Sequence, residues 1–504
     1  MPIRPILLCL LLTPLFAAAQ ERDTRALIIV IDGLRPDYIT PEWMPNLYAL
    51  GERGVFGDNH HSVVPTVTRV NSPSIATGSY PRTHGIMGNS MYVPEVRRGQ
   101  ALNTGDRAAL LQIAEAYGGE LLTAPSLGEI LHAQGKVFFA ASSGSTGSGF
   151  LLNHRAPNGG GALVHTEYVV PDTLRPLVER VLGPFMDPAT PGIERARRAL
   201  DAILLLGLDH FDADAMIVWF TEPDATTHAT GVGSPQTLEM LTYVDREMGR
   251  FLDGLQERGE LETTNIFVIS DHGFSQLIGG RPSYAALLVD RGLKASTTSD
   301  DVVISGEAIH VAAGGPGRIA AIVRALQETE GVGAIFTRGE PGSVKGSVPG
   351  TLSLAMASWD HARSADVLVF SDWLPDENSH GFPGLVTASG LAATHGSTSP
   401  FDVRAAFLAA GPDIKRGIRT GVPTGNADLA PTVLWLLGLP VPPGMDGRVL
   451  HELLTEGPDP SDVEVRTRQH VAETSWGTGS YRVMVQRSEV DGTPYLDFTR
   501  VTRN

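Results

Sequence analysis

The chain has 504 residues, of which 42% are hydrophobic and 19% are charged, an ordinary balance for a globular protein. Its length allows one large domain with an inserted lobe, or two domains. The formal net charge of −17 argues against a nucleic-acid-binding surface as the main feature. The only cysteine is Cys9, close to the N-terminus, so disulfides and thiol catalysis are not expected.

The N-terminal residues have the pattern of a secretory signal. Arg4 supplies the positive charge, residues 6–16 form an apolar run, and the alanines at 17–19 suit a cleavage site. The run is short for a membrane span, although an uncleaved anchor is the alternative, and no second long apolar run follows. We therefore expect a signal peptide at 1–19, no transmembrane anchor after its removal, and export to a bacterial periplasm or secretion.

Predicted strands and helices alternate along the first part of the chain. Residues 26–31 form a continuous apolar run, as in a parallel strand that is buried on both faces. Ser126 and Glu129 form a capping box that begins a helix, and residues 137–141 follow as the next strand. This alternation predicts an α/β fold with a mostly parallel central sheet flanked by helices. Other expected elements are a strand at 405–410 and helices at 41–53, 191–206, 235–258 and 428–437.

The pattern changes between residues 276 and 372, where short strands surround one helix. We interpret this segment as a small α+β lobe that covers the site. It would be inserted into a catalytic domain formed by residues 20–275 and 373–504. The elements expected in the lobe are a helix at 317–329 and strands at 285–289, 302–304, 332–337 and 366–370.

Three further segments are interpreted from their composition. The tail at 463–502 alternates as strands do and has a turn signal at Asp491-Gly492. Residues 142–149 are rich in serine and glycine, which favours a surface loop. The adjacent His60 and His61 are also expected in a surface loop.

Three of the strand-like runs lead into aspartates, and the sequence places Asp32, Asp224 and Asp271 at or just beyond their ends. In an open parallel sheet, ligands gather at the carboxyl ends of the strands, so we expect these carboxylates to lie together. His228 follows Asp224 by four residues, so a helical turn would present both on one face. His272 directly follows Asp271, and a sharp turn there can present two ligands.

Thr68 lies where an apolar, strand-like piece changes into a helix-like piece. Helix N-termini favour anions through their free N–H groups and the helix dipole. A threonine oxygen placed there can attack phosphorus, but it is a poor nucleophile at its ordinary pKa. No base is adjacent in the sequence, so coordination to a metal ion would have to activate it.

A further histidine, His395, lies just before the predicted strand at 405–410. Imidazole and carboxylate ligands without thiolate suit zinc, or less selectively manganese or another divalent ion. With Thr68 there are seven candidate ligands, which are too many for one tetrahedral ion. The set therefore suits two divalent ions about 4 Å apart, one on the nucleophile and one on the incoming oxygen.

In their residues and their order, these motifs resemble the type I phosphodiesterase / nucleotide pyrophosphatase family of the alkaline phosphatase superfamily. The resemblance extends over residues 26–417, and its motifs are 31–37 (IDGLRPD), 65–71 (PTVTRVN), 76–78 (ATG), 81–85 (PRTHG), 222–228 (EPDATTH), 270–273 (SDHG) and 394–396 (THG). It implies an alkaline phosphatase-like fold and two zinc ions. The implied ligands of one ion are Asp224, His228 and His395, and those of the other are Asp32, Asp271, His272 and the nucleophile Thr68.

Two asparagines and an arginine complete the implied site. Asn89 matches the asparagine that hydrogen-bonds a phosphate oxygen, and Asn71 is the nearer alternative. Arg69 stands where many nucleotide-cleaving members have an aromatic residue that stacks on the base. Arg69 could instead pair with a second phosphate or a carboxylate, because a guanidinium makes bidentate contacts, or it could be a surface residue. A sulfatase would need Cys or Ser in place of Thr68.

The expected activity is metal-dependent hydrolysis of a phosphodiester or pyrophosphate bond in a small phosphorylated substrate, through a phospho-threonine intermediate. A phosphomonoesterase on the same site is one alternative, although it needs extra cationic groups and the sequence identifies no lysine near the site. A phosphonate hydrolase is another. A non-enzymatic binding protein would be expected to lack some ligands, whereas all seven positions are occupied.

Overall fold

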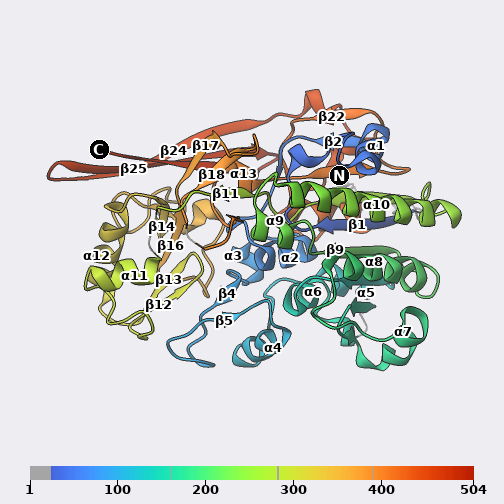
Figure 1. Ribbon diagram of the computed structural model, residues 1–504, viewed down its shortest axis with the longest axis horizontal. Coiled ribbons are helices and arrows are strands. Elements are labelled where there is room, and N and C mark those ends of the chain that lie inside the picture. Colours follow the sequence, from blue (N-terminus) through green and yellow to red (C-terminus); the bar gives the residue numbers. More distant parts are fainter. Residues whose placement is uncertain (1–23, 159–160, 281–282, 389) are drawn as a thin grey trace, which may run out of the picture.

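A computed structural model describes residues 24–158, 161–280, 283–388 and 390–504. The predicted signal peptide at 1–19 lies outside these residues. Within them, no helix is long and apolar enough to cross a membrane. The chain folds around a nine-stranded sheet (Figure 1), whose order is β22 (Ile418–Thr420), β2 (Val55–Gly57), β21 (Phe407–Ala410), β10 (Thr264–Ile269), β1 (Arg25–Ile31), β9 (Ala215–Phe220), β6 (Phe138–Ser142), β7 (Ala162–His165) and β8 (Val169–Val170).

The middle of this sheet is parallel. Strand β1 pairs in parallel with β10 on one side and β9 on the other, and β6 continues the parallel run to β7. Antiparallel neighbours occur toward the edges, at β21 and β8. Successive side chains of β1 point to opposite faces and are buried on both. The predicted α/β fold with a mostly parallel central sheet is therefore confirmed.

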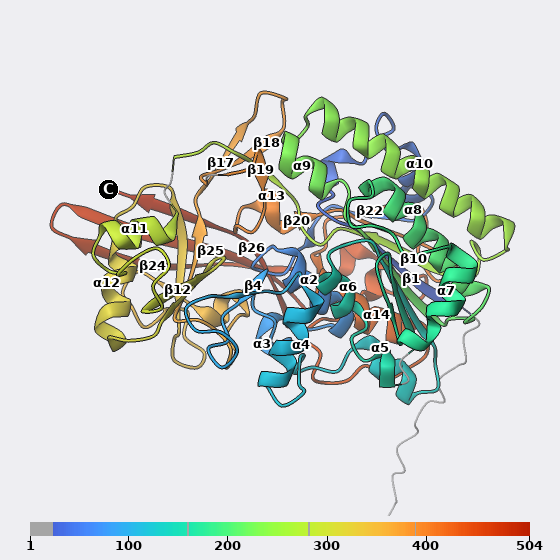
Figure 2. The ribbon, with the colours of Figure 1, turned by 60° about the horizontal axis from the view of Figure 1, so that its bottom comes forward.

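Helices cover both faces of the sheet (Figure 2). The even-numbered side chains of β1 belong to an apolar cluster shared with helices α4 (Arg107–Ala116), α5 (Leu127–Ala133) and α14 (Leu429–Leu436). The odd-numbered side chains belong to a second cluster, shared with α1 (Pro45–Arg53), α8 (Gly192–Ala202) and α10 (Pro235–Glu257). Burial of apolar surface in these two layers is what holds the central strands in place.

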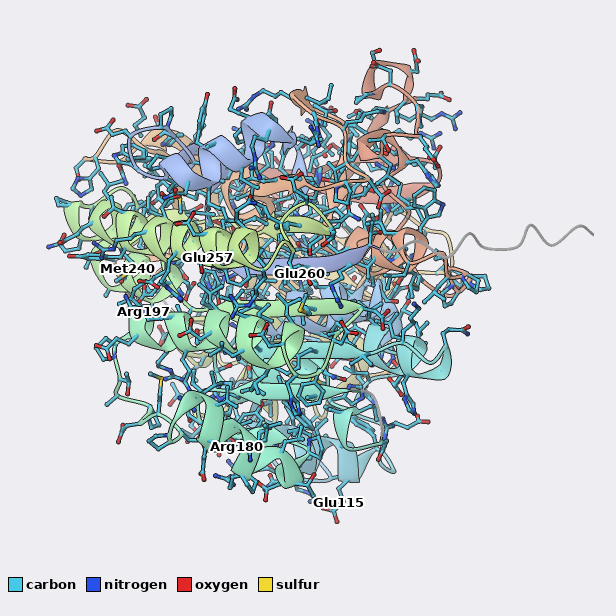
Figure 3. All side chains as sticks on the ribbon, turned by 90° about the vertical axis from the view of Figure 1, so that its right-hand side faces the viewer. Glu115, Arg180, Arg197, Met240, Glu257 and Glu260 are labelled. Carbon is cyan, nitrogen blue, oxygen red and sulfur yellow. The ribbon has the colours of Figure 1, made fainter. Side chains whose placement is uncertain are left out.

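Helix α10 shows how the outer layer is built. Ser234 begins it by accepting a hydrogen bond from the Thr237 backbone N–H, and Pro235 occupies the first helical position. Its apolar side packs on the sheet, whereas Figure 3 shows its outer surface, with Met240 and Glu257, beside Arg197 of α8. The helix is therefore amphipathic, as its sequence predicts.

A five-stranded sheet forms much of the segment interpreted as an inserted lobe (Figure 1). Its order is β12 (Val302–Ser305), β13 (Ala308–Val311), β16 (Val367–Ser371), β14 (Val332–Thr337) and β15 (Leu352–Ser353), and helix α12 (Gly315–Gln327) belongs to the same segment. The domain boundaries at 276 and 372 stay a prediction.

Two local predictions are wrong. Residues 285–289 are not a strand but part of helix α11 (Tyr284–Asp290), which Ser283 caps. The apolar run alone fits either element, and its buried residues turn out to have helical spacing. The expected loop at 142–149 contains the start of helix α6 (Thr146–Leu152). Gly147 is needed there because a Cβ would lie 2.0 Å from a backbone carbonyl oxygen of the adjoining loop.

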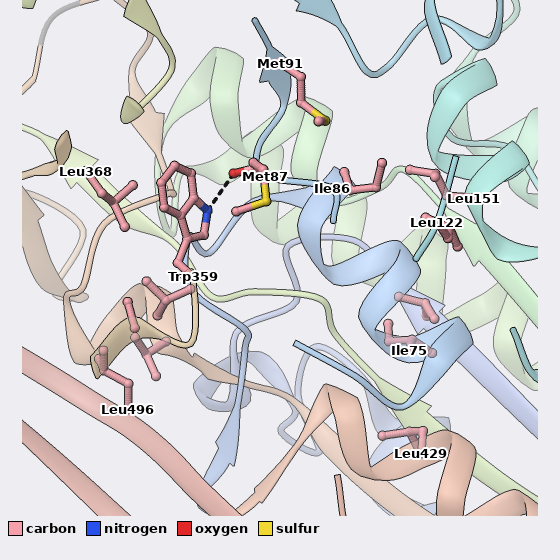
Figure 4. Packing of buried hydrophobic residues seen from close by; sticks show 14 of the residues in the cluster. Ile75, Ile86, Met87, Met91, Leu122, Leu151, Trp359, Leu368, Leu429 and Leu496 are labelled. Carbon is pink, nitrogen blue, oxygen red and sulfur yellow. Dashed lines mark hydrogen bonds between the residues drawn. The ribbon is translucent and has the colours of Figure 1, made fainter. Parts of the chain in front are cut away.

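Trp359 joins the lobe to the helical layer. Its side chain is fully buried, and its Nε1 donates a hydrogen bond to the Met87 backbone oxygen at 2.9 Å. Figure 4 shows the indole between Met87 and Leu368, in a cluster that continues to Ile75 and Leu429. The lobe and the central domain thus share one apolar core.

The tail forms an antiparallel sheet of β24 (Arg466–Trp476), β25 (Gly479–Val490) and β26 (Thr493–Arg503). Asp491 and Gly492 make the predicted turn, with positive φ angles of 51° and 84°. The smaller elements are α3 (Pro81–His84), α7 (Arg175–Leu182), α13 (Pro400–Val403), β3 (His60–His61), β4 (Ser90–Met91), β5 (Leu102–Asn103), β11 (Ser275–Leu277), β17 (Trp373–Glu377), β18 (Pro383–Val386), β19 (Ala393–Thr394), β20 (Arg404–Ala405) and β23 (Thr424–Gly425).

The prediction of a surface loop for His60 and His61 is also wrong, because both are buried in β3 between β20 and β23. The Nδ1 of His60 lies 2.8 Å from the Thr424 hydroxyl, and its Nε2 lies 2.9 Å from the Asn426 side-chain oxygen. Both ring nitrogens therefore have partners. Burial lowers the pKa of His60 to about 3.

This burial predicts a pH dependence. The unfolded His60 binds a proton below about pH 6.5, and the folded one does not until about pH 3. The free energy of unfolding should therefore fall as pH decreases through this window, by up to about 1.4 kcal/mol per pH unit for this group. In chelator-treated protein unfolded with urea, His60→Gln should reduce that slope, and His380→Gln, at an exposed position, should not. An unchanged slope in His60→Gln would contradict the assignment.

Candidate active site and metal centre

The register of the central strands brings the predicted aspartates together. Val30 of β1 pairs with Ile269 of β10, and Ile31 pairs with Phe220 of β9, so the three strands end side by side. The residues that follow these ends include the aspartates Asp32 and Asp271, and Asp224 at the first position of helix α9 (Asp224–Thr230). The carboxyl ends of the parallel strands therefore form one edge, as predicted.

Gly33 allows the strand ends to come this close. Its φ angle is 71°, and a Cβ would lie 3.1 Å from the Cα of Asp224 and 3.0 Å from the Phe274 ring. Its backbone N–H donates a hydrogen bond to Asp271 Oδ1 at 3.1 Å. A side chain at this position would separate the aspartates from one another.

Each of the predicted histidine ligands is held by a backbone carbonyl. The Nδ1 atoms of His228, His272 and His395 lie 2.9, 2.9 and 2.7 Å from the backbone oxygens of Ala393, Gly273 and Thr66. A carbonyl oxygen only accepts, so Nδ1 carries the proton in each ring. The Nε2 lone pair is then free for another partner, as in metal-ligating histidines.

These Nε2 atoms face carboxylate oxygens that have no hydrogen-bond donor. His228 and His395 lie 3.4 and 3.5 Å from Asp224 Oδ1. The Nε2 of His272 lies 3.1 Å from Asp271 Oδ2 and 3.4 Å from Asp32 Oδ1. All three of these carboxylate oxygens are buried and unpartnered. Two groups of residues are close enough to hold a metal ion, because within each group the ligand atoms lie within 4.8 Å of one another. One group is Asp224, His228 and His395, and the other is Asp32, Asp224 and His272.

The electrostatics of this cluster favour a cation. Burial, together with Asp271 and Asp224, raises the pKa of Asp32 well above its ordinary value. Burial lowers the pKa of His395 well below its ordinary value, and His272 adds to the effect. Burial also acts to lower the pKa of His272, but Asp271 and Asp224 raise it above its ordinary value overall. The carboxylates can therefore be compensated by a proton on His272 or by a divalent ion between the ligands. The imidazole and carboxylate donors fit zinc or a related divalent ion.

Thr68 lies at the edge of the cluster, at the first position of helix α2 (Thr68–Thr77). Its hydroxyl oxygen is 3.5 Å from the Nε2 of His272, and the residue is 6% exposed. The next backbone N–H, of Arg69, donates to the Oδ1 of Asn89 at 3.0 Å. The helix N-terminus thus holds the threonine oxygen and the Asn89 amide on the same side of the site.

Asn71 does not join the site. It is fully buried, and its Nδ2 donates to the backbone oxygens of Val63 and Val67 at 3.2 and 3.1 Å. Its Oδ1 accepts from the Val63 N–H and from Asn426. With both amide protons used within the protein, Asn71 has a structural role in the loop that precedes Thr68.

Trp219 is a residue of the site that the sequence interpretation missed. It is fully buried at the end of β9, and its indole N–H donates to Asp32 Oδ2 at 3.0 Å. This hydrogen bond orients the carboxylate so that its other oxygen faces His272. The pairing of Trp219 with Val30, two residues before Asp32, puts the indole near this aspartate. This proximity could be recognised only once the strand register was known.

A cavity of about 300 Å³ is lined in part by His395. The segment that carries this residue also contributes Thr394 and Ser397 to the lining, and the lobe contributes Ile304 and Glu307. The lining is partly apolar and includes neither Thr68 nor the three aspartates, so His395 is the residue at which the cavity borders the cluster.

The metal assignment predicts how ligand changes alter metal content. Wild-type protein dialysed against zinc should retain about two ions per chain. Asp224→Asn should lose bound zinc, because it removes the carboxylate charge of the residue shared by both ligand groups. Trp219→Phe keeps every ligand but should weaken zinc affinity by about 10–100-fold. Elemental analysis and competition with a chelator measure both. The exposed Asp253→Asn is the control, and equal zinc content in Asp224→Asn would contradict the site.

Comparison with known proteins places the chain in a family. A family model described as type I phosphodiesterase / nucleotide pyrophosphatase matches residues 26–373. Human ectonucleotide pyrophosphatase/phosphodiesterase family member 1 is 28% identical over 253 residues, which are 50% of this chain and 23% of the human protein. Venom phosphodiesterase of Naja atra is 27% identical over 262 residues, which are 51% of this chain and 27% of the venom protein. The match thus spans about a quarter of these relatives' length.

Solved structures share the fold. An inactive variant of murine ectonucleotide pyrophosphatase/phosphodiesterase 5 in complex with AMP superposes with a TM-score of 0.61 at 17% identity, over 86% of this chain and 100% of that one. A mutant of alkaline phosphatase PafA superposes with a TM-score of 0.66 at 16% identity, over 87% of this chain and 100% of that one. The fold is therefore alkaline phosphatase-like. With a family match over residues 26–373, the chain belongs to the type I phosphodiesterase / nucleotide pyrophosphatase family.

Proposed function

We propose that this protein hydrolyses phosphodiester or pyrophosphate bonds, with Thr68 as the nucleophile and two bound zinc ions. The observation that carries this proposal is the position of the Thr68 hydroxyl at a helix N-terminus, 3.5 Å from the Nε2 of His272. A nucleophile next to a set of divalent-metal ligands is the arrangement that phosphoryl transfer requires.

The proposed ligands of the two ions are Asp224, His228 and His395 for one, and Asp32, Asp271, His272 and Thr68 for the other. When bound, the ions would lower the pKa of the threonine hydroxyl and of a water molecule, and would neutralise charge on the phosphoryl oxygens. The orientation of the ligands comes from the protein itself, through the carbonyl partners of the histidines and the Trp219 donor to Asp32.

The reaction would proceed in two displacements at phosphorus. The Thr68 oxygen forms a bond to phosphorus while the bond to the leaving oxygen breaks, which gives a phospho-threonine. Water then forms a bond to phosphorus, the Thr68 oxygen leaves, and the hydroxyl regains its proton. Asn89 is placed to donate its amide N–H to a phosphoryl oxygen, because its Oδ1 is already held by the Arg69 backbone N–H.

The proposed substrates are small phosphorylated molecules, nucleotides or other diesters. In favour of nucleotides, the murine relative's structure contains AMP, and the similar curated proteins are named for nucleotide pyrophosphatase or phosphodiesterase activity. The cavity beside His395 has room for one substituent of the phosphoryl group. The predicted signal at 1–19 leads us to propose that the enzyme acts in a bacterial periplasm or after secretion.

A phosphomonoesterase is the second candidate. That reaction needs an additional cation for a dianionic phosphoryl group, and the sequence identified no lysine for this role. The structure favours keeping the candidate because Arg69, directly after the nucleophile, interacts electrostatically with the aspartates of the metal site.

The test is a kinetic comparison on zinc-loaded protein. We expect bis-p-nitrophenyl phosphate or thymidine 5′-monophosphate p-nitrophenyl ester to be cleaved at least about 100-fold faster than p-nitrophenyl phosphate, which corresponds to about 3 kcal/mol in transition-state binding. Thr68→Ala should lower kcat by at least about 1000-fold, because no other group would accept the phosphoryl group.

The controls separate chemistry from folding. Thr68→Ser keeps a hydroxyl and should retain measurable turnover and form a covalent adduct detectable by mass spectrometry after acid quench. Thr68→Ala should keep its melting temperature and form no adduct. Turnover of Thr68→Ala at the wild-type rate would exclude the nucleophile, and preference for the monoester would favour the second candidate.

A further inference from the structure

Arg69 carries a charge for which the protein provides no partner. Its side chain is partly buried, and its Nε is enclosed without a hydrogen-bond acceptor. Within the described ranges, the Arg69 guanidinium forms no ion pair with a carboxylate. By contrast, Arg35 and Arg448, which are more deeply buried, pair with Asp37 and Glu452. A guanidinium removed from water without an anion is unfavourable, so its position calls for another explanation.

The Arg69 guanidinium lies close to Gly105, which has no side chain to crowd it. A Cβ on Gly105 would lie 3.4 Å from the Cζ of Arg69, 3.0 Å from the Asn103 side-chain oxygen and 3.4 Å from the Ser145 hydroxyl. The Arg69 guanidinium therefore packs close to the Gly105 backbone, where a side chain would crowd it. Two polar side chains, Asn103 and Ser145, lie near the same glycine.

The charges that Arg69 does sense belong to the metal site. Burial lowers the pKa of the Arg69 guanidinium, and the negative charges of Asp32, Asp224 and Asp271 partly oppose this, although none of them forms an ion pair with it. In the proposed enzyme these carboxylates bind the metal ions, so they cannot also neutralise the guanidinium. Two divalent ions would balance the three aspartates and leave one positive charge, so Arg69 would bring the net charge of the loaded site to about +2 while Thr68 keeps its proton.

We propose that Arg69 binds a second negative charge of the substrate, at or next to the reacting phosphorus, so that turnover of substrates with such a charge depends on this side chain. This inference rests on the proposed function. The second charge has two chemical sources, namely the adjacent phosphoryl group of a pyrophosphate bond and the second charge of a phosphate monoester. Both present oxygens that the two-pronged guanidinium can bind.

Three substrates separate these sources. The p-nitrophenyl ester of AMP carries one charge at phosphorus, ADP-ribose adds a charged second phosphoryl group, and p-nitrophenyl phosphate places both charges on one phosphoryl group. The kcat/KM of each is measured for zinc-loaded wild-type protein and for Arg69→Gln, Arg69→Lys and the exposed control Arg98→Gln. Zinc content and melting temperature are measured for every variant.

We expect Arg69→Gln to lower kcat/KM by about 10–100-fold for a doubly charged substrate, the range for a lost hydrogen bond to a charged group. The singly charged ester should change less than about threefold, and Arg69→Lys should fall in between because it keeps the charge but loses the fork. A loss confined to ADP-ribose identifies the adjacent phosphoryl group, and a loss confined to p-nitrophenyl phosphate identifies the monoester. Arg98→Gln should behave as wild type.

Two results would overturn the inference while the proposed function stands. One is an equal loss for all three substrates, which would assign Arg69 to the charge they share or to the fold. The other is no loss for any of them. If wild-type protein cleaves none of the three and forms no adduct on Thr68, the proposed function itself is wrong, and the inference falls with it.

Discussion

Buried like charges are the constraint on which this structure depends. Asp32, Asp224 and Asp271 reach one place from three strand ends, and each turns a carboxylate oxygen without a donor toward the others. Such a group is stable only if protons or a metal cation compensate the charge. Three features keep these charges close together: the parallel register, Gly33 and the helical layers that pack on the strands. Without them, the strand ends could move apart and separate the carboxylates.

Hydrogen bonds from the surrounding protein keep the predicted ligands in their orientations. Backbone carbonyls fix the tautomers of the histidines, and Trp219 fixes Asp32. Asn426 extends this shell. It hydrogen-bonds to His60, to the Asn71 side chain and to the backbone oxygen of Asp271, so the loop before Thr68 and the strand end at Asp271 share one partner. The buried His60 thus helps to hold Asn426, which in turn contacts segments next to the site.

The reacting side of the site is built differently from the ligand side. Helix α2 presents two consecutive residues at the site: Thr68, and Arg69, whose backbone N–H is used by Asn89 and whose side chain forms no ion pair. The lobe adds a partly apolar cavity that His395 helps to line. A phosphoryl group at Thr68 would meet fixed donors, an unneutralised cation and room for a substituent, which are the determinants of substrate choice.

The sequence by itself determined the sheet class and the family, and it predicted the candidate ligand positions, because apolar runs, fixed spacings and ordered motifs are local properties. Only the tertiary structure decided which side chains are consumed by the fold. Asn71 was the alternative to Asn89 for contact with a phosphate oxygen, and the structure shows its side chain hydrogen-bonded to Asn426, 355 residues away. Likewise, whether Arg69 has a partner depends on loops that meet only in three dimensions, and hydrogen bonds between distant segments leave no local pattern in a sequence.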